Sequence, residues 1–265
     1  MEGYDNTSYG EAFADVYDDW YGTISDVEST VAALARFAAE TAPAAVIELG
    51  VGTARLAIPL AQALPDCSVW GIDASPAMLS NALAKHPPEN VRLVQGDMVG
   101  ELATIAAGQP VGLVFVAFNT FFNLASHASQ RDCFAAVADR LAPGGRFVIE
   151  AFVPDEPARR GDHIEVKSLR SDRVVLSVTR YDGQQHVEGQ FVEFTESGGV
   201  RLRPWSIRYV TPAELDAMAD AVGLVREHRW ETFAGEVFDD DSGRHVTVYT
   251  RPPVPPVDTA RLRPV

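Results

Sequence analysis

The sequence is poor in cysteine and has no long hydrophobic run. Only two cysteines, Cys67 and Cys133, occur among the 265 residues, far apart and without a CxxC pair. This spacing excludes a disulfide scaffold and a cysteine-based metal site, and it favours structural thiols in a reduced, cytoplasmic protein. No stretch of about 18 apolar residues is present, and the first twenty residues are acidic and aromatic, so we expect neither a membrane span nor a signal peptide.

Basic residues are also scarce. The chain holds 22 Lys and Arg against 37 Asp and Glu, which gives a formal net charge of −15 at pH 7. An acid excess of this size repels phosphate backbones, and no Lys/Arg-rich run offers a local binding site. We therefore expect no nucleic acid and no membrane among the partners. The length suits one large domain with a smaller appendage.

What the sequence does contain is an alternation of short apolar runs and helical patterns. After a helical period over residues 24–40, five β-type runs follow at 44–50, 67–73, 91–97, 111–118 and 145–152, with helices expected at 53–64, 76–85 and 130–141. This alternation predicts βαβ crossovers and a mostly parallel sheet. The continuous apolarity of LVFVAF indicates strands that are covered on both faces.

Between about residues 162 and 209 the helical patterns disappear. Four β-type segments follow one another there, with turn signals at residues 182–183 and 198–199, which predicts an antiparallel β-meander inserted into the α/β domain. A helix at 212–222 and strands at 224–232 and 245–251 then complete the alternating α/β pattern that precedes the meander. Two helix starts are marked by capping residues, Ser75 before Pro76, and Thr211 three residues before Glu214.

These patterns divide the chain into five parts. We expect an N-terminal helical lid, a cofactor-binding core, an antiparallel β insertion for substrate or dimer contacts, a completion of the core, and a Pro-rich tail, at residues 1–43, 44–153, 154–209, 210–251 and 252–265. The insertion also offers a surface for a homo-oligomer.

Three successive strand ends carry residues suited to a nucleotide-like cofactor. The first ends in Glu48, a glycine turn with Gly50 and Gly52, and then a helix, whose free N–H groups suit a closely approaching ligand. Asp73, at the tip of the second, is placed to accept from both hydroxyls of a ribose. Asp97 ends the third and can accept from an adenine amine. A nicotinamide dinucleotide and S-adenosylmethionine both meet this description.

Two residues favour S-adenosylmethionine. Arg55 stands where the dinucleotide fingerprint requires Gly or Ala for close packing of the helix on the strand. Glu48 stands where a pyrophosphate would need neutralising, but its carboxylate suits a ligand that bears an ammonium group.

In these features the chain resembles the class I S-adenosylmethionine-dependent methyltransferases, and within them the aminosugar and lincosamide-type N-methyltransferases. The motifs are VIELGVGTARLAIPLA, GIDASPAML, VQGDM and LAPGGRFVIEAF. The resemblance implies a Rossmann-like fold with a seven-stranded, mostly parallel sheet and a terminal antiparallel strand. It implies a cofactor site built from the residues of these motifs and their neighbours, namely Tyr17, Glu48, Gly50, Gly52, Thr53, Asp73, Ala74, Met78, Asp97, Met98 and Phe118.

The end of the fourth strand is the expected site of methyl transfer. There Phe118 and Asn119 are placed beside the methyl donor, and Asn123 faces the acceptor. Related N-methyltransferases often carry His or Tyr at the position of Asn123, so no obvious base stands there. His127, near the start of the next helix, is the candidate base for an alcohol or phenol.

The N-terminal segment combines tyrosines and other aromatic residues with four aspartates. Aromatic faces attract cations such as a substrate ammonium. Related enzymes use such a segment as a lid, so we expect Tyr17 and Tyr9 to contact the reactants.

These features predict N-methylation of a small-molecule acceptor, a cationic amine, by positioning rather than strong base catalysis. O-methylation with His127 as base is the alternative, followed by a nicotinamide oxidoreductase and a non-catalytic cofactor-binding protein. The aspartate run at residues 239–241 is interpreted as a solvated turn, and no metal site is expected.

Overall fold

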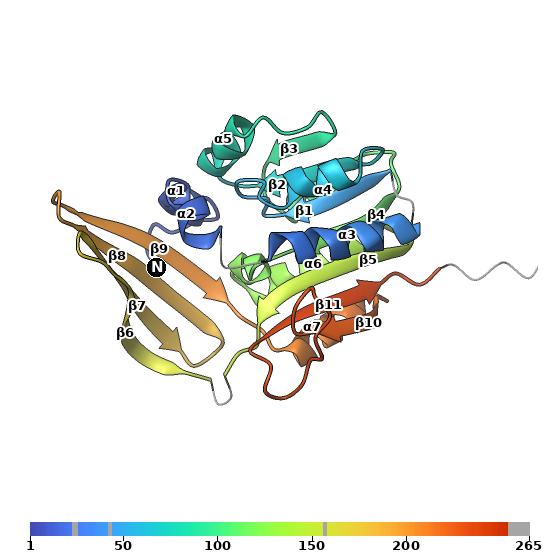
Figure 1. Ribbon diagram of the computed structural model, residues 1–265. Helices are drawn as coiled ribbons and strands as arrows, with labels where there is room; N and C mark the ends of the chain where they lie inside the picture. The colour runs from blue at the N-terminus through green and yellow to red at the C-terminus, as the bar shows by residue number, and fades with distance from the viewer. Residues whose placement is uncertain (23–25, 42–43, 156–157, 254–265) are drawn as a thin grey trace, which may run out of the picture.

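The computed structural model describes residues 1–22, 26–41, 44–155 and 158–253. They form a seven-stranded sheet with helices on both faces and, beside it, a four-stranded antiparallel sheet (Figure 1). The predicted α/β fold, with its inserted meander, is therefore confirmed. No helix in this part of the chain is long and apolar enough to cross a membrane.

The large sheet has the strand order β10-β11-β5-β4-β1-β2-β3. Its strands are β1 Ala45–Leu49, β2 Ser68–Asp73, β3 Val91–Gln95, β4 Val111–Val116, β5 Leu141–Phe152, β10 Val225–Trp230 and β11 Arg244–Thr250. The first five pair in parallel, whereas β11 runs antiparallel to both β5 and β10. Chain order thus reverses beside β1, which is where open α/β sheets bind ligands at their carboxyl ends.

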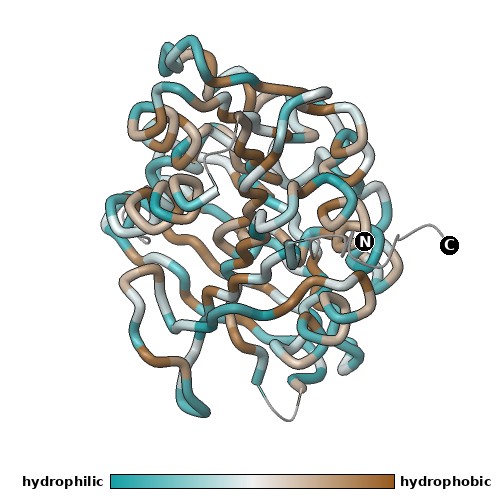
Figure 2. The backbone as a smooth tube through the Cα atoms, turned by 90° about the vertical axis from the view of Figure 1, so that its right-hand side faces the viewer, coloured by the Kyte–Doolittle hydropathy of each residue, from teal (hydrophilic) through white to brown (hydrophobic). Residues whose placement is uncertain are grey.

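The helices cover both faces because neighbouring strand residues point to opposite sides. The long helices are α3 Val27–Thr41, α4 Ala57–Ala63, α5 Pro76–Ala84, α6 His127–Arg140 and α7 Pro212–Ala221. Helix α3 packs on the side of Val46 and Phe115, while α6 and α7 pack on the side of Ile47 and Val114. Figure 2 shows the hydrophobic segments gathered toward the middle of the molecule.

Several expected boundaries need correction. Helix α4 begins at Ala57 rather than Thr53, because Ala54 adopts a left-handed φ of 57° that interrupts the helix. Helix α6 begins at His127 rather than residue 130, since Ser126 forms a capping box with Ser129. The caps at Ser75 and Thr211 are confirmed. Residue 24, at the expected start of the first helix, and tail residues 254–265 lie outside the described residues.

The second sheet has the order β6-β7-β8-β9, with strands Arg160–Leu169, Arg173–Asp182, His186–Thr195 and Val200–Arg208. Two short helices, α1 Ser8–Phe13 and α2 Tyr17–Tyr21, lie between this sheet and the carboxyl edge of the large one (Figure 1). Phe13 and Trp20 pack edge-on against Phe191 of β8 at ring distances of 5.8 and 5.7 Å.

Candidate functional site

A cavity lies at the carboxyl ends of the parallel strands, beneath α1. The space between its walls, counted together with the part that is open to solvent, is about 770 Å³. Residues after β1, β2, β3 and β4 line it together with the N-terminal segment. They include Tyr4, Tyr9, Gly10, Tyr17, Gly50, Gly52, Asp73, Ala74, Met78, Asp97, Met98, Thr120, Asn123 and Leu124.

The glycine turn after β1 leaves room for a ligand. Gly50 and Gly52 have φ values of 68° and 54°, which side-chain-bearing residues rarely adopt. A Cβ on Gly50 would lie 2.2 Å from Cγ2 of Thr120, whereas a Cβ on Gly52 would meet nothing within 4 Å. The turn is therefore closely packed behind Gly50 and open at Gly52.

Asp73 joins the turn to the end of β2. Its carboxylate accepts hydrogen bonds from the backbone N–H of Gly52 at 2.8 Å and of Ser75 at 2.9 Å, one on each oxygen. Burial raises the pKa of Asp73, and these two hydrogen bonds oppose the rise. Because an ionised carboxylate has about four acceptor sites, it can still accept from ligand hydroxyls.

Glu48 is a buried acid at the end of β1. Its atom Oε2 has no hydrogen-bond partner in the described part of the chain. Burial raises the pKa of Glu48 to about 8, the guanidinium of Arg55 opposes this, and the charge of Asp73 adds to it. A cationic group that reaches Glu48 would stabilise the ionised form of its side chain. This buried carboxylate therefore fits a ligand with an ammonium group.

The outer part of the cavity is framed by Asp97. One oxygen of this exposed carboxylate accepts from the backbone N–H groups of Val99 and Gly100 at 3.0 and 2.8 Å, which turns the chain after β3. Met98 lies beside it, with Met78 on the cavity wall. A flat apolar ring with a polar edge fits between these side chains.

Tyrosines of α1 and α2 form the other wall. The rings of Tyr17 and Tyr21 lie 5.0 Å apart, and the ring of Tyr9 stacks on that of Phe13 at 4.4 Å. Burial raises the pKa of both Tyr9 and Tyr17, so their hydroxyls stay protonated at neutral pH. These groups can donate hydrogen bonds but are poor bases.

Helix α1 is held against α5 of the large domain. Glu11 accepts hydrogen bonds from Oγ of Ser75 at 2.8 Å and from the backbone N–H of Ala77 at 3.1 Å, at the start of α5. A Cβ on Gly10 would lie 2.2 Å from Cβ of Ser75, so only glycine permits this approach. Nothing in the local sequence pattern indicates either contact.

Three of the four aspartates of the N-terminal segment make structural contacts. Asp5 accepts from Thr7 and Ser8 ahead of α1. Asp18 accepts from Oγ1 of Thr53 at 2.6 Å and pairs with Lys85 at 2.7 Å. Asp15, as described below, pairs with arginines of β9. These carboxylates therefore do not by themselves support a cationic acceptor.

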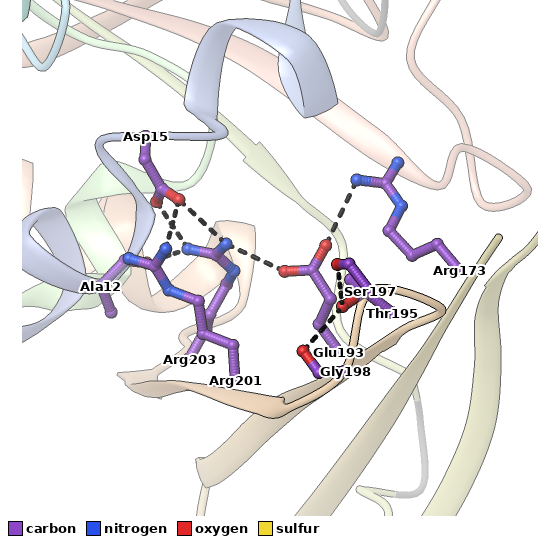
Figure 3. Close-up of polar contacts among 9 residues, drawn as sticks. All are labelled: Ala12, Asp15, Arg173, Glu193, Thr195, Ser197, Gly198, Arg201 and Arg203. Atoms are coloured by element: carbon purple, nitrogen blue, oxygen red, sulfur yellow. Dashed lines mark hydrogen bonds and ion pairs between the residues drawn. The ribbon is translucent and has the colours of Figure 1, made fainter.

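Arg203 anchors the segment between α1 and α2 to the second sheet (Figure 3). Its side chain is 1% exposed and pairs with Asp15 at 2.6 Å and with Glu193 at 2.9 Å. It also donates to the carbonyl of Ala12 and lies over the ring of Trp20, 5.3 Å from its centroid.

Five residues expected in the site do not line the cavity: the buried acid Glu48 and four others. Thr53 is buried and donates to Asp18, while Oδ1 of Asn119 accepts from the backbone N–H of Phe152 at 2.7 Å. The backbone N–H of Phe118 donates to the carboxylate of Glu150 at 2.9 Å. The ring of Phe118 packs against that of Tyr21, with their centroids 5.4 Å apart. His127 is exposed at the first position of α6.

Asn123, by contrast, lines the cavity, and its side-chain amide has no hydrogen-bond partner among the described residues. Thr120 and Tyr4 also line it, and the sequence analysis did not identify them. Phe118 and Asn119 adopt φ values of 52° and 66°, an unusual pair of left-handed residues at the end of β4. Within the described ranges, no group of three or more His, Cys, Asp or Glu side chains is arranged for a metal ion.

Comparison with known proteins reveals a family relationship. Residues 46–145 match the family model described as a methyltransferase domain. A demethylmenaquinone methyltransferase of Thermus thermophilus is 32% identical over 199 residues, covering 74% of this chain and 81% of that protein. A tRNA (guanine-N(7)-)-methyltransferase of Mycolicibacterium gilvum is 32% identical over 112 residues, and there the chain spans only 43% of its relative.

Two solved structures extend the likeness over almost the whole chain. The CcbJ methyltransferase of Streptomyces caelestis is 36% identical, with a TM-score of 0.82 over 94% of this chain and 100% of that one. The S-adenosylmethionine-bound CalS10 of Micromonospora echinaspora, an amino pentose methyltransferase, is 27% identical, with a TM-score of 0.66 over 89% and 96%.

Proposed function

This chain belongs to the S-adenosylmethionine-dependent methyltransferases, and on that basis we propose that it methylates an amino group of a small natural product. When bound, S-adenosylmethionine supplies an electrophilic methyl group on a sulfonium. Every further step depends on how the residues of this chain bind the cofactor, orient the acceptor and exclude water.

The chemistry of the cavity residues suggests which part of the cofactor each of them would contact. The open turn at Gly50 and Gly52 would lie against its amino-acid portion, and Glu48 would receive the ammonium group. Asp73 would accept from the ribose hydroxyls. Asp97 would accept from the adenine amine, with Met78 and Met98 against the ring.

One observation carries the choice of an amine. The cavity wall beyond the glycine turn presents Tyr9, Tyr17 and the unpartnered amide of Asn123, and no described histidine lines it. His127 is exposed on α6, outside the cavity lining. An amine that arrives deprotonated needs no general base, whereas an alcohol or phenol does.

A second hollow supports an acceptor of ring size. It lies where β5 ends against the inner face of the second sheet, and aromatic side chains line it, including Phe152, Tyr181, Trp205 and Tyr209. The backbone N–H of Phe152 donates a hydrogen bond to Oδ1 of Asn119, which connects this hollow to the end of β4. The similarity of this chain to CalS10, an amino pentose methyltransferase, agrees with such an acceptor.

The test is transfer of a labelled methyl group from S-adenosylmethionine onto two matched sets of small acceptors, amino sugars and phenols. We expect product with amines, and unchanged turnover when His127 is replaced by Ala. Methylation of phenols alone, abolished in His127→Ala, would instead establish the O-methyltransferase alternative.

A further inference from the structure

The chain makes an unusual turn where β4 ends. Phe118 and Asn119 follow one another with left-handed φ values, a conformation that costs free energy in any residue that carries a side chain. Two such residues in succession keep this conformation only where contacts from outside the turn hold them. The neighbouring strand β5 supplies these contacts.

Glu150 of β5 binds both residues of the turn. Oε2 of its carboxylate accepts a hydrogen bond from the backbone N–H of Phe118 at 2.9 Å, and its backbone carbonyl oxygen accepts from the N–H of Asn119 at 3.0 Å. The regular pairing of β4 with β5 ends one residue before Glu150. These two bonds therefore extend the contact between the strands beyond the last regular pair of the sheet.

The position of Glu150 along β5 explains why its carboxylate needs a partner. Side chains alternate along a strand, so Glu150 lies on the same face as Val148, which is fully buried. Burial raises the pKa of Glu150, while the N–H of Phe118 and the guanidinium of Arg55 oppose the rise. A side-chain oxygen can accept this hydrogen bond in either protonation state, so the bond rather than the charge is the feature to test.

The turn leads directly into the wall of the cavity. A single-turn helix, Thr120–Asn123, follows Asn119, and both of its end residues line the cavity. Thr120 also packs closely behind the glycine turn, because its Cγ2 lies only 2.2 Å from where a Cβ on Gly50 would be. A shift of the turn would therefore move Thr120 and Asn123 relative to the cofactor side of the cavity.

The side chain of Phe118 connects the same turn to the tyrosines of α2. Its ring lies 5.4 Å from that of Tyr21, which lies 5.0 Å from that of Tyr17 on the cavity wall. Glu150 lies outside the lining that the described residues give to the cavity and to the aromatic hollow beside Phe152. Any effect of Glu150 on the reactants is therefore transmitted through the turn.

We propose that Glu150 is a positioning residue for methyl transfer, because it fixes the left-handed pair that sets the places of Asn123 and of the Phe118 ring. Methyl transfer needs donor and acceptor within about 3–3.5 Å and aligned, and a displacement of about 1 Å can cost about 100-fold in rate. This inference rests on the proposed methyl transfer at this cavity, but not on the choice between an amine and a phenol as acceptor.

The experiment compares the full-length protein with Glu150→Met, which removes the acceptor oxygen, and Glu150→Gln, which keeps one. We expect kcat of Glu150→Met to fall by about 30- to 100-fold, measured with an amino sugar or, if only phenols accept the methyl group, with a phenol. Its affinity for S-adenosylhomocysteine and its Michaelis constant for the acceptor should stay within about threefold of the wild-type values. Glu150→Gln should restore kcat to within about threefold, since its amide oxygen can accept from the N–H of Phe118.

Hydrogen exchange gives a readout that needs no acceptor. With S-adenosylhomocysteine bound, the backbone amides of residues 117–124 should exchange about tenfold faster in Glu150→Met and at the wild-type rate in Glu150→Gln. If no acceptor is methylated, the proposed function fails, and this comparison still decides whether Glu150 holds the turn. Equal exchange in all three proteins would overturn the proposal.

Glu214→Met is the matched control for a merely structural effect. Glu214 also accepts from a backbone N–H, that of Thr211 at 2.7 Å, but it lies outside the cavity lining. Its loss should lower stability and leave kcat unchanged. If circular dichroism shows that Glu150→Met does not fold, Glu150→Asp replaces it, since it keeps the charge but withdraws the carboxylate by one methylene group, and its kcat should fall about tenfold. Wild-type turnover in the folded Glu150 variant, or an equal loss in Glu214→Met, would overturn the proposal.

Discussion

The carboxylate of Asp73 accepts a hydrogen bond of 2.8 Å from the backbone N–H of Gly52, a residue that lies 21 positions earlier in the chain. Its second oxygen accepts from the backbone N–H of Ser75, the residue that caps α5. One side chain therefore fixes the positions of the glycine turn, the end of β2 and the start of α5 relative to one another. The same carboxylate lines the cavity, so we expect both cofactor binding and the shape of the site to depend on this one group.

Replacing Asp73 by Ala should weaken binding of S-adenosylhomocysteine by about 10- to 100-fold, since ribose contacts and the support of the turn are lost together. Isothermal titration calorimetry measures this directly. Asp73→Asn keeps one carbonyl acceptor and should bind with intermediate affinity. Equal affinity for all three proteins would show that the cofactor binds elsewhere.

Glu48 predicts a pH dependence of folding stability. Its pKa is near 4.5 when exposed and is raised to about 8 in the folded protein. The folded state therefore binds the proton more tightly. The resulting stabilisation is fully present below pH 4.5 and is lost as the pH rises toward 8, with a slope of up to about 1.4 kcal/mol per pH unit.

Urea unfolding of the ligand-free protein between pH 5 and 8 should reveal this loss, and Glu48→Gln should remove it, because an amide does not titrate. A wild-type curve that parallels the Glu48→Gln curve over the whole range would contradict the prediction. Cofactor binding at neutral pH should also release a proton, since an ammonium group beside Glu48 lowers its pKa.

Tyr17→Phe should reduce turnover more than tenfold while affinity for S-adenosylhomocysteine is kept, because the hydroxyl orients the acceptor rather than the cofactor. Steady-state kinetics and calorimetry on the same preparation separate these two effects. Tyr249→Phe is a useful control, since its hydroxyl donates to Asp216 away from the cavity and its loss should lower stability without lowering turnover. Unchanged kinetics in Tyr17→Phe would refute the role of the lid.

Arg203 and Arg201 form a matched pair, because both contact Asp15, at 2.6 and 2.7 Å. Arg203 is 1% exposed and Arg201 53% exposed. Arg203→Met should lower the free energy of unfolding by about 3–5 kcal/mol, since it leaves the buried carboxylate of Glu193 with only the more distant Arg173, at 3.3 Å. Arg201→Met should cost less than about 1 kcal/mol, as is usual for exposed ion pairs. Similar losses in both variants would contradict this assignment.

Gly10→Ala should separate α1 from α5. The added Cβ would collide with Cβ of Ser75, and the resulting shift should raise the Michaelis constants for both substrates. Gly243→Ala is the control, because a Cβ there meets nothing within 4 Å and the backbone has no left-handed φ. If the two variants have the same kinetics, close docking of α1 is not required for activity.

Much of this architecture was predictable from local sequence patterns. Apolar periodicity located the strands and most helices, and capping residues such as Ser75 and Thr211 marked helix starts, because each signal depends on neighbours in the chain. The positions of Gly50, Gly52, Asp73 and Asp97 around one cavity followed as well, since the carboxyl ends of parallel strands meet at one edge.

Contacts between distant residues were not predictable in this way. Asn119 has a side-chain amide of the kind that can act in catalysis. Its Oδ1, however, accepts a hydrogen bond from the backbone N–H of Phe152. The N-terminal aspartates suggested a cationic acceptor, yet Asp15 and Asp18 pair with Arg203 and Lys85. A residue type allows several partners, and only tertiary packing selects one of them.

The sequence by itself therefore determined the fold and the cofactor edge of the site, because periodicity and strand ends are local properties. Only the tertiary structure decided that Tyr4 joins Tyr9 and Tyr17 at the cavity, that Gly10 lets α1 approach Ser75, and that Arg203 anchors the segment between α1 and α2. These features arise from side chains up to about 190 residues apart, whose proximity depends on how the two sheets pack.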